Sequence, residues 1–294
     1  METLRLPDWL KQKKRKSDAT RELGKILDRE VPNTVCQEAK CPNRGECFAR
    51  GQLTFLILGT VCTRNCSFCS IRHGKPLPPD RSELETILHA IKRLNLRFVV
   101  LTSPNRDDLP DGGASHYAYI VQGIKINHPD VKVEVLIPDF QGNYDQLQTV
   151  LDANPDVLNH NIETVPTLYK GIRMGSLYQR SLDVLKEVKS RRPDILTKTG
   201  IMLGLGESHD ELIETFRDIQ AQGVDILTLG QYLRPGKENA EVKKYYHPDE
   251  FNHYKKEAEE QGIRFVFSGP WVRSSYLADH VFEDVKDSPL AHVG

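Results

Sequence analysis

The sequence predicts an α/β protein built on a partial barrel of six β/α units, (β/α)6, with an extension at each end of the chain. Three observations predict this fold class. Six short runs rich in β-branched and apolar residues have the character of buried strands, and a helical segment follows each run. The flanking segments do not supply the roughly two further units that an eight-stranded barrel needs. Strand alternating with helix favours right-handed βαβ connections and a parallel sheet.

The predicted strands and helices alternate regularly along the chain. In order, the strands are Thr54–Leu58, Phe98–Thr102, Lys132–Leu136, Val157–Asn161, Thr197–Met202 and Ile226–Gly230. The helical segments that follow them are Ser82–Asn95, Ser115–Asn127, Tyr144–Ala153, Leu177–Arg191, Asp210–Gln222 and Asp249–Gln261. The first helical segment carries apolar residues three and four positions apart, on one stripe that we expect to face the sheet: Leu84, Ile87, Leu88, Ile91 and Leu94.

These elements divide the chain into three regions. Residues 1–50 contain three cysteines but no long periodic run, and residues 51–262 form the predicted barrel. Residues 263–294 hold one strand-like stretch, Arg264–Phe267, before an irregular tail. We therefore expect an N-terminal and a C-terminal extension around a single barrel.

Composition and charge argue against several classes of protein. Lys and Arg number 40 and Asp and Glu number 41, for a net charge of −1, so no overall basic field indicates nucleic-acid binding. The longest strongly apolar stretch, residues 55–61, is far shorter than the ~20 residues of a membrane span. No apolar segment follows the charged N-terminus as it would in a secretory signal. We therefore expect a cytoplasmic protein with reduced thiols.

All six cysteines lie between positions 36 and 69, in two groups of three. The first group, C-x4-C-x5-C, and the second, C-x3-C-x2-C, are Cys36, Cys41 and Cys47, and Cys62, Cys66 and Cys69. A cubic four-iron cluster needs one ligand per iron, so three thiolates leave one iron open to another ligand. Zinc is the alternative, but it prefers four Cys or His ligands, and His73 is the only nearby imidazole. Disulfides are disfavoured in a reducing compartment.

The second cysteine group follows the first predicted strand. This position places it in a loop at the C-terminal mouth of the barrel, where such barrels carry their chemistry. Phe68 directly precedes its last cysteine. The C-x3-C-x-aromatic-C loop resembles that of the radical S-adenosylmethionine (SAM) superfamily. The resemblance implies a partial (β/α)6 radical-SAM barrel and a 4Fe-4S cluster whose unique iron binds SAM.

The first cysteine group narrows the resemblance to the lipoyl synthase family. Residues 35–47, Val-Cys-Gln-Glu-Ala-Lys-Cys-Pro-Asn-Arg-Gly-Glu-Cys, look like the auxiliary-cluster motif of that family. Further segments match in order and spacing: residues 101–103, 106–114, 159–166, 204–207, 229–235 and the Arg-Ser-Ser-Tyr motif at 273–276. Pro104-Asn105 and Ser70 are small departures, since Val-Asp and Asp are expected there. Neither departure removes a ligand.

This resemblance implies insertion of two sulfur atoms at C6 and C8 of an octanoyl chain carried on a protein lysine, which produces the lipoyl group. It implies SAM and two 4Fe-4S clusters as cofactors, with the auxiliary cluster supplying the sulfur. The implied partners are octanoylated lipoyl carrier domains (2-oxoacid dehydrogenase E2 subunits and the glycine cleavage H protein), a ferredoxin or flavodoxin as low-potential electron donor, and a cluster-repair protein. Neither nucleic acid nor membrane is an expected partner.

The resemblance also assigns the fourth auxiliary ligand to a serine of the Arg-Ser-Ser-Tyr motif. We expect this to be Ser275, although spacing alone does not separate it from Ser274. A hydroxyl is a hard ligand that should leave iron more readily than a thiolate, which suits a cluster that must open. The alternative is that these serines cap a following helix.

Candidate SAM-binding residues are the polar groups at the strand ends that face the mouth, together with the aromatic residue of the loop. They are Phe68, Thr102, Ser103, Asn161, Glu163, Arg173 and Lys198. Loop capping and surface salt bridges are their alternative roles. His160 alternates with Asn161 and is expected to be a structural histidine. Gly112-Gly113 and Gly204-Leu205-Gly206 complete no phosphate-binding motif, so we expect tight turns there.

Two other functions remain open from the sequence. A biotin-synthase-like radical SAM enzyme is the first, but it would lack both the first cysteine group and the Arg-Ser-Ser-Tyr motif. A non-catalytic zinc module on a barrel is the second, and iron and sulfide analysis would separate it. The basic run at Lys11 and residues 13–16 is either a solvated tail or an arm that attracts an acidic carrier domain.

Overall fold

The computed structural model describes residues 4–11, 34, 43, 53–275 and 278–287 of the chain. The three cysteines of the first group, Cys36, Cys41 and Cys47, lie outside the described residues, as do basic residues 13–16. The predicted barrel lies almost entirely within them.

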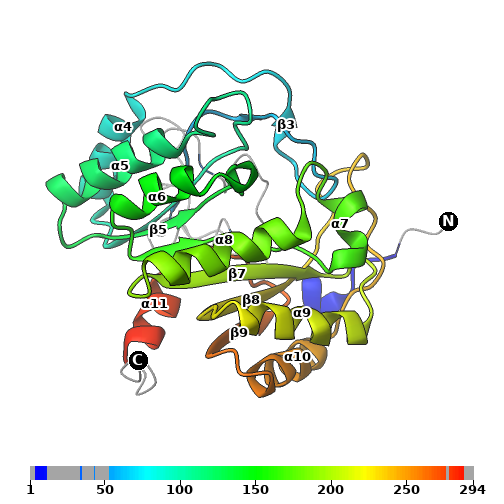
Figure 1. Cartoon of the computed structure of the whole chain (residues 1–294). Coiled ribbons are helices and arrows are strands. Elements are labelled where there is room, and N and C mark those ends of the chain that lie inside the picture. The colour runs from blue at the N-terminus through cyan, green and yellow to red at the C-terminus, as the bar shows by residue number, and fades with distance from the viewer. Residues whose placement is uncertain (1–3, 12–33, 35–42, 44–52, 276–277, 288–294) are drawn as a thin grey trace.

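The core is a parallel sheet of seven strands in the order β1-β4-β5-β6-β7-β8-β9 (Figure 1). Six strands correspond to predicted runs: β1 (Thr54–Leu56), β4 (Phe98–Thr102), β5 (Lys132–Leu136), β6 (Val157–Asn159), β7 (Leu196–Leu203) and β8 (Ile226–Gln231). Each strand pairs in parallel with the next one in this order, and β1 and β9 are the outermost of these seven strands. Thr34 forms an isolated antiparallel bridge with Phe55 of β1. The predicted α/β fold with consecutive parallel strands is confirmed.

The seventh strand comes from a stretch that the sequence assigns to the C-terminal extension. Arg264–Phe267 lies largely within β9 (Phe265–Gly269), which pairs in parallel with β8. Helix α10 (Pro248–Glu260) connects these two strands, so they form one further βαβ unit. Val266 is buried in the same apolar cluster as Phe251 of α10. This burial explains why so short a run joins the sheet.

The helices that connect the strands cover the outer face of the sheet (Figure 1). Those that match the prediction are α4 (Glu83–Leu94), α5 (Ala114–Asn127), α6 (Tyr144–Asp152), α8 (Tyr178–Arg191), α9 (His209–Ala221) and α10. Two short 3-10 helices are η1 (Asp8–Leu10) and η2 (Phe140–Gly142). The sequence missed α7 (Pro166–Ile172) and α11 (Ala278–Asp287). A seven-residue helix such as α7 is too short to show a clear helical period.

The two faces of the sheet differ in polarity. Outward side chains such as Val99 and Val133 are fully buried against the helices. The inward face carries polar side chains, among them Glu134 and Lys198, which are also buried. Buried polar side chains are unusual in a core that serves only for packing. The inner face of this sheet is therefore a candidate for a functional site.

The inner face is covered at the end where the strands begin. Val281 and Val285 of α11 pack with Ile226 at the start of β8, and Phe282 lies against Phe98 with ring centroids 5.5 Å apart. In Figure 1, α11 lies at one end of the sheet, and β3 and α7 lie at the other. The inner face is therefore covered at the N-terminal ends of the strands, and its chemistry belongs at their C-terminal ends.

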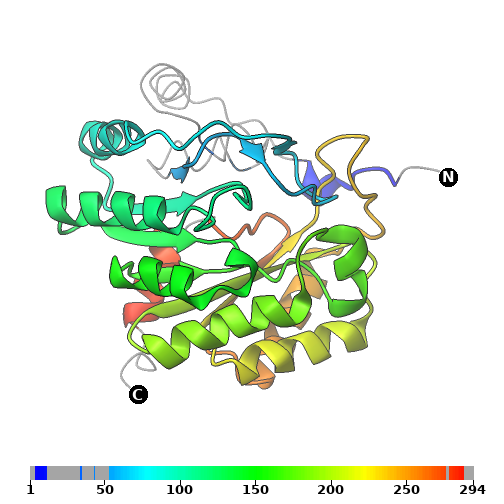
Figure 2. The same ribbon diagram turned by 45° about the horizontal axis from the view of Figure 1, so that its top comes forward.

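The segment after β9 turns back across the inner face (Figure 2). A Cβ atom on Gly230 of β8 would lie 2.0 Å from the carbonyl oxygen of Val272. Only glycine permits this approach of the two backbones. Within the described part of the chain, no helix has the length and apolar character that crossing a bilayer requires.

Candidate active site

The second cysteine group lies in a loop at the C-terminal ends of the strands, here named the cysteine loop (residues 57–74). Two short strands, β2 (Val61–Cys62) and β3 (Arg72–His73), pair in parallel and bring the ends of this loop together. The Gly74 N–H donates to the Cys62 carbonyl oxygen at 3.0 Å. This pairing returns the chain on itself and gathers the three cysteines in one compact loop.

The thiols of this loop need a cation to ionise. Burial, with a smaller contribution from the neighbouring cysteines, raises the pKa of Cys66 to about 12 and that of Cys69 to about 11. No three His, Cys, Asp or Glu side chains among the described residues lie close enough together for a single metal ion. A cubic cluster binds its ligands at separate corners and so tolerates wider spacing. The donor set therefore fits an iron–sulfur cluster better than zinc.

A cavity of about 440 Å³ opens beside Cys66 and Cys69. The segment that follows β8 forms its opposite wall. In that segment Asn239 Nδ2 donates to the Cys69 carbonyl oxygen at 2.8 Å, and the Ala240 N–H donates to the Ser67 carbonyl oxygen at 2.8 Å. The cavity thus adjoins two cysteines and offers room for a small molecule next to a cluster.

Asn161 and Glu163 lie together where β6 ends. Asn161 Nδ2 donates to Glu163 Oε1 at 3.0 Å and to Ser274 Oγ at 3.3 Å. The Asn161 Oδ1 atom is buried without a hydrogen-bond partner in the described structure. Glu163 has a φ of 73°, rare for a residue with a side chain, and burial raises the pKa of its carboxyl group. An unpaired buried amide oxygen indicates a site that a ligand donor completes.

Thr102 and Ser103 lie at the end of β4, as predicted. Ser103 Oγ lies 3.1 Å from the Tyr117 hydroxyl oxygen, and the Thr102 carbonyl oxygen accepts a hydrogen bond of 2.8 Å from the Ile57 N–H. Thr102 is buried and Ser103 partly so. Phe68 is also partly buried within the cysteine loop.

Arg173 binds a buried polar cluster behind β6. Its guanidinium donates to the hydroxyls of Tyr169 and Ser181, the latter at 2.8 Å. His160 Nδ1 lies 2.9 Å from the Ile137 carbonyl oxygen, so this nitrogen carries the proton and Nε2 accepts from Ser181 Oγ at 3.0 Å. His160 is fully buried with both ring nitrogens bonded. The expected structural role of His160 agrees with these contacts.

Lys198 is not brought to the mouth with the other candidates. Its ammonium pairs with both oxygens of Glu134 at 3.1 and 3.0 Å, and both side chains are 1% exposed. Asn159 Nδ2 adds a hydrogen bond of 3.2 Å to the same carboxylate. These contacts favour a buried ion pair in the barrel interior over direct SAM binding. The burial of Lys198 also contradicts the alternative of a surface salt bridge.

The C-terminal segment reaches the site that the resemblance implies. Ser274 bonds Asn161, whereas the Ser275 hydroxyl has no partner among the described residues. Asn43, two positions after Cys41, donates through Nδ2 to the Trp271 carbonyl oxygen at 2.6 Å. The segment that leads to Ser275 thus contacts Asn43, the one described residue of the first cysteine motif.

The glycines at 204 and 206 form a tight turn, as expected. Their φ values are 108° and 118°, which favour glycine. The Glu207 carboxylate accepts the N–H groups of Gly204, Leu205 and Gly206. The turn is therefore filled by the chain's own carboxylate.

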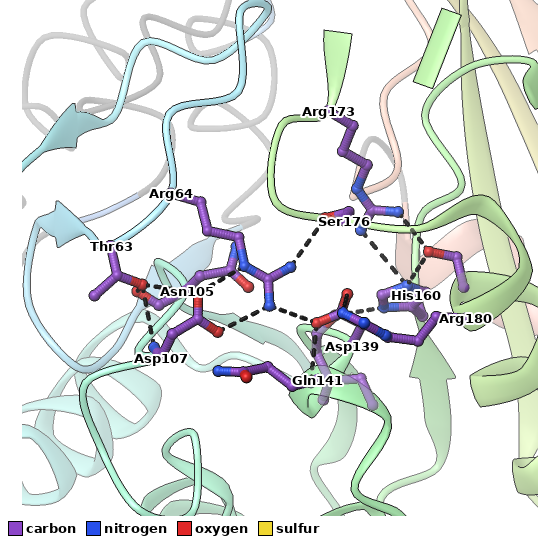
Figure 3. Close-up of polar contacts among 12 residues, drawn as sticks. Thr63, Arg64, Asn105, Asp107, Asp139, Gln141, His160, Arg173, Ser176 and Arg180 are labelled. Atoms are coloured by element: carbon purple, nitrogen blue, oxygen red, sulfur yellow. Dashed lines mark hydrogen bonds and ion pairs between the residues drawn. The ribbon is translucent and has the colours of Figure 1, made fainter. Parts of the chain in front are cut away.

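The sequence missed one part of the site, the partners of Arg64. This arginine lies between the first two cysteines of the loop, and its guanidinium binds Asp107, Asp139 and Ser176 (Figure 3). Asp107 belongs to a matched family motif, but sequence reasoning gave it no partner. No sequence signal marks Asp139, which lies 75 positions from Arg64.

Comparisons with known proteins agree with this geometry. A profile described as the Radical SAM superfamily matches residues 56–219. The chain is 47% identical over 281 residues to the lipoyl synthase of Methylobacillus flagellatus, covering 95% of this chain and 86% of that protein. It is 50% identical over 277 residues to the lipoyl synthase of Caldanaerobacter subterraneus subsp. tengcongensis, covering 94% and 97%.

Solved structures support the fold. Methylornithine synthase matches with a TM-score of 0.56 and 15% identity, covering 84% of this chain and 81% of that chain. Streptococcus suis SuiB bound to S-adenosylmethionine matches with a TM-score of 0.53 and 12% identity, covering 84% and 59%. At such identities the likeness shows the fold alone.

Proposed function

The chain belongs to the lipoyl synthase family of the radical SAM superfamily, and from this premise we propose how its residues share the formation of the lipoyl group. The reaction replaces two C–H bonds, at C6 and C8 of a protein-bound octanoyl-lysine, by two C–S bonds. Its cofactors are SAM and two 4Fe-4S clusters. The observation that carries the proposal is the three-cysteine loop at the mouth of the barrel in a chain 47–50% identical to lipoyl synthases.

Cys62, Cys66 and Cys69 hold the cluster that binds SAM. When bound, the clusters and SAM supply the electron, the carbon radical and the sulfur, which no side chain can provide. The chain's own part is to hold and orient these groups. The cavity of about 440 Å³ beside Cys66 and Cys69 supports this assignment.

Residues around the inner face orient SAM. Glu163 offers an acceptor for the ammonium group or ribose hydroxyls of SAM, and Asn161 offers its unpaired amide oxygen. Arg173 supplies a cation close enough to influence both Glu163 and Cys66. Thr102 and Ser103 at the end of β4 and Phe68 in the cysteine loop are the further residues that we assign to SAM binding. Lys198 does not contact SAM in this proposal. Its ion pair with Glu134 stabilises the polar interior of the sheet nearer the N-terminal ends of the strands.

Cys36, Cys41 and Cys47 hold the auxiliary cluster, and Ser275 is its fourth ligand. The contact between Asn43 and Trp271 supports this proposal, because Asn43 belongs to the first cysteine motif and Trp271 to the C-terminal segment. Ser274 is engaged by Asn161, which leaves Ser275 as the hydroxyl available to iron. The first cysteine group and the Arg-Ser-Ser-Tyr motif then meet over the barrel mouth.

The substrate is an octanoylated lipoyl carrier domain. Carrier domains of 2-oxoacid dehydrogenase E2 subunits and of the glycine cleavage H protein present the required lysine. A ferredoxin or flavodoxin supplies electrons, and a cluster-repair protein restores the consumed auxiliary cluster. A cytoplasmic location suits thiols that must stay reduced.

Anaerobic incubation with SAM, dithionite and an octanoyl-lysyl peptide tests the function by mass measurement. The reconstituted protein should yield a peptide that has gained two sulfur atoms. The variant Cys62→Ala/Cys66→Ala/Cys69→Ala should yield neither this product nor 5′-deoxyadenosine. An unchanged peptide from a protein that carries both clusters and cleaves SAM would contradict the proposed substrate.

A further inference from the structure

Arg64 lies in the middle of the cysteine loop but points away from the cavity, into the protein. Its side chain is 5% exposed although the loop lies at the surface of the barrel mouth. We propose that Arg64, through Asp107 and Asp139, is the positioning residue that fixes the cysteine loop in the conformation that holds its cluster. This inference rests on the proposed role of Cys62, Cys66 and Cys69 as cluster ligands.

The first contact of Arg64 is with the segment after β4. Arg64 Nε and Nη2 donate to the two oxygens of Asp107 at 2.7 and 2.8 Å, a two-point pair that fixes direction as well as distance (Figure 3). The neighbouring Thr63 hydroxyl lies 3.2 Å from Asp107 Oδ2 and donates to the Asn105 carbonyl oxygen at 3.0 Å. Two successive residues of the cysteine loop are therefore attached to one segment.

The two segments that this attachment joins each place a backbone N–H beside a cysteine sulfur. The Asn105 N–H lies 3.3 Å from Cys62 Sγ, and the Arg64 N–H lies 3.4 Å from it. Both N–H groups belong to the segments that the pair between Arg64 and Asp107 joins. Hydrogen bonds to ligand sulfurs are among the factors that set the potential of an iron–sulfur cluster. Loosening the pair should therefore change the cluster itself.

The second and third contacts bring in two more segments. Arg64 Nη2 donates to Asp139 Oδ1, after β5, at 2.6 Å, and Nη1 donates to Ser176 Oγ, after α7, at 2.9 Å. The Asp139 side chain is fully buried and also pairs with Arg180 at 3.4 Å. The loop with the cysteines is thus fastened to three segments by one side chain.

Arginine is the side chain that suits this position. Its planar fork presents several fixed donors, so it can bind two carboxylates and a hydroxyl at once, whereas lysine offers a single compact charge. The Arg64 guanidinium contacts no iron ligand's side chain. Arg64, Asp107 and Asp139 do not line the cavity beside Cys66 and Cys69, although Arg64 and Asp107 do line a second cavity of about 620 Å³. The network therefore holds the geometry of the cysteine loop from outside the cavity beside Cys66 and Cys69.

The parent protein for the test is the full-length chain with Cys36, Cys41 and Cys47 replaced by Ala, so that only the cluster of the cysteine loop can form. Asp107→Asn and Asp139→Asn are introduced separately, and each is compared in apoprotein stability, iron content, rate of iron loss to a chelator, and reduction potential. Asp225→Asn is the matched control, because Asp225 is also a buried carboxylate, pairs with Lys189 and Arg264, and lies at the opposite end of the sheet.

Loss of a residue that orients metal ligands typically weakens metal binding about 10- to 100-fold. We expect iron loss at least about tenfold faster in Asp107→Asn and Asp139→Asn, with a more negative potential, and neither change in Asp225→Asn. Arg64→Lys should behave like Asp139→Asn, because lysine cannot span both carboxylates.

Three outcomes separate the possibilities. The positioning role would be overturned if Asp107→Asn and Asp139→Asn lose iron at the same rate as Asp225→Asn and have the same reduction potential. Equal loss of apoprotein stability in Asp139→Asn and Asp225→Asn, with faster iron loss only in Asp139→Asn, would support it. Failure of the parent protein to take up iron at Cys62, Cys66 and Cys69 would instead overturn the proposed cluster assignment.

Discussion

Gly230 on β8 lets the segment that carries Ser274 and Ser275 lie directly on the sheet. A Cβ atom added at this position would lie 2.0 Å from the Val272 carbonyl oxygen. Real Cβ atoms essentially never come closer than 3.0 Å to such an atom. Gly230→Ala must therefore push the segment away by at least about 1 Å, and such overpacking typically costs about 1–3 kcal/mol of unfolding free energy.

The displacement should separate the two halves of the reaction. A misplacement of about 1 Å can lower a rate on the order of 100-fold when the displaced group must meet a reacting atom. We expect sulfur insertion by Gly230→Ala to fall by about this factor, while SAM cleavage to 5′-deoxyadenosine falls much less. The assay measures both products by mass spectrometry in single-turnover reactions.

Gly269→Ala supplies the control. Gly269 of β9 pairs with Gly230 in the sheet register, and a Cβ there would lie 3.4 Å from Val272 Cγ2, which is an ordinary contact. This variant should insert sulfur at nearly the parent rate. Equal sulfur insertion by Gly230→Ala and Gly269→Ala would refute the reasoning that the seating of this segment controls sulfur transfer.

Three further predictions concern single side chains. Ser275→Ala should keep SAM cleavage but lose sulfur insertion, whereas Ser274→Ala should lose less; equal product from both variants would contradict the ligand role of Ser275. Lys198→Met leaves Glu134 buried and unpaired, so urea unfolding should show a loss of about 3–5 kcal/mol; an unchanged midpoint would contradict the buried pair. Burial lowers the pKa of His160 from 6.5 to about 3, so below pH 6.5 only the unfolded chain takes up this proton. The unfolding free energy should fall as pH drops from 6.5 toward 3, and His160→Asn should show a smaller fall in that window.

Strands and outer helices were predictable because burial imposes a period on the sequence. The helix α4 follows its apolar stripe almost residue for residue, since Ile87 and Ile91 face the core. The strand β9 was placed in the extension because the segment after it offers no further unit to mark it as part of the sheet. Helix α11 escaped prediction because its apolar face packs on the inner side of the sheet, where no helix was expected.

For the candidate site, the sequence offers a signal only where residue type and spacing coincide. The spacing of three cysteines in one loop indicates a cluster site, and the predicted strand before Asn161 and Glu163 indicates that they lie at its C-terminal end. Lys198 could not be placed, because its partner Glu134 lies 64 positions away on β5. Arg64 and Asp139 show the same limit, since a contact between remote loops leaves no periodic trace in the sequence.

Isotopic labelling tests the central claim, that this chain forms the lipoyl group with sulfur held by its first cysteine group. The protein is reconstituted with heavy-isotope sulfide, freed of excess sulfide, and given SAM, dithionite and an octanoyl-lysyl peptide for one turnover. The account predicts a product with two heavy sulfur atoms, and none from a variant with Cys36, Cys41 and Cys47 replaced by Ala. Light sulfur in the product, or labelled product from that variant, would contradict it.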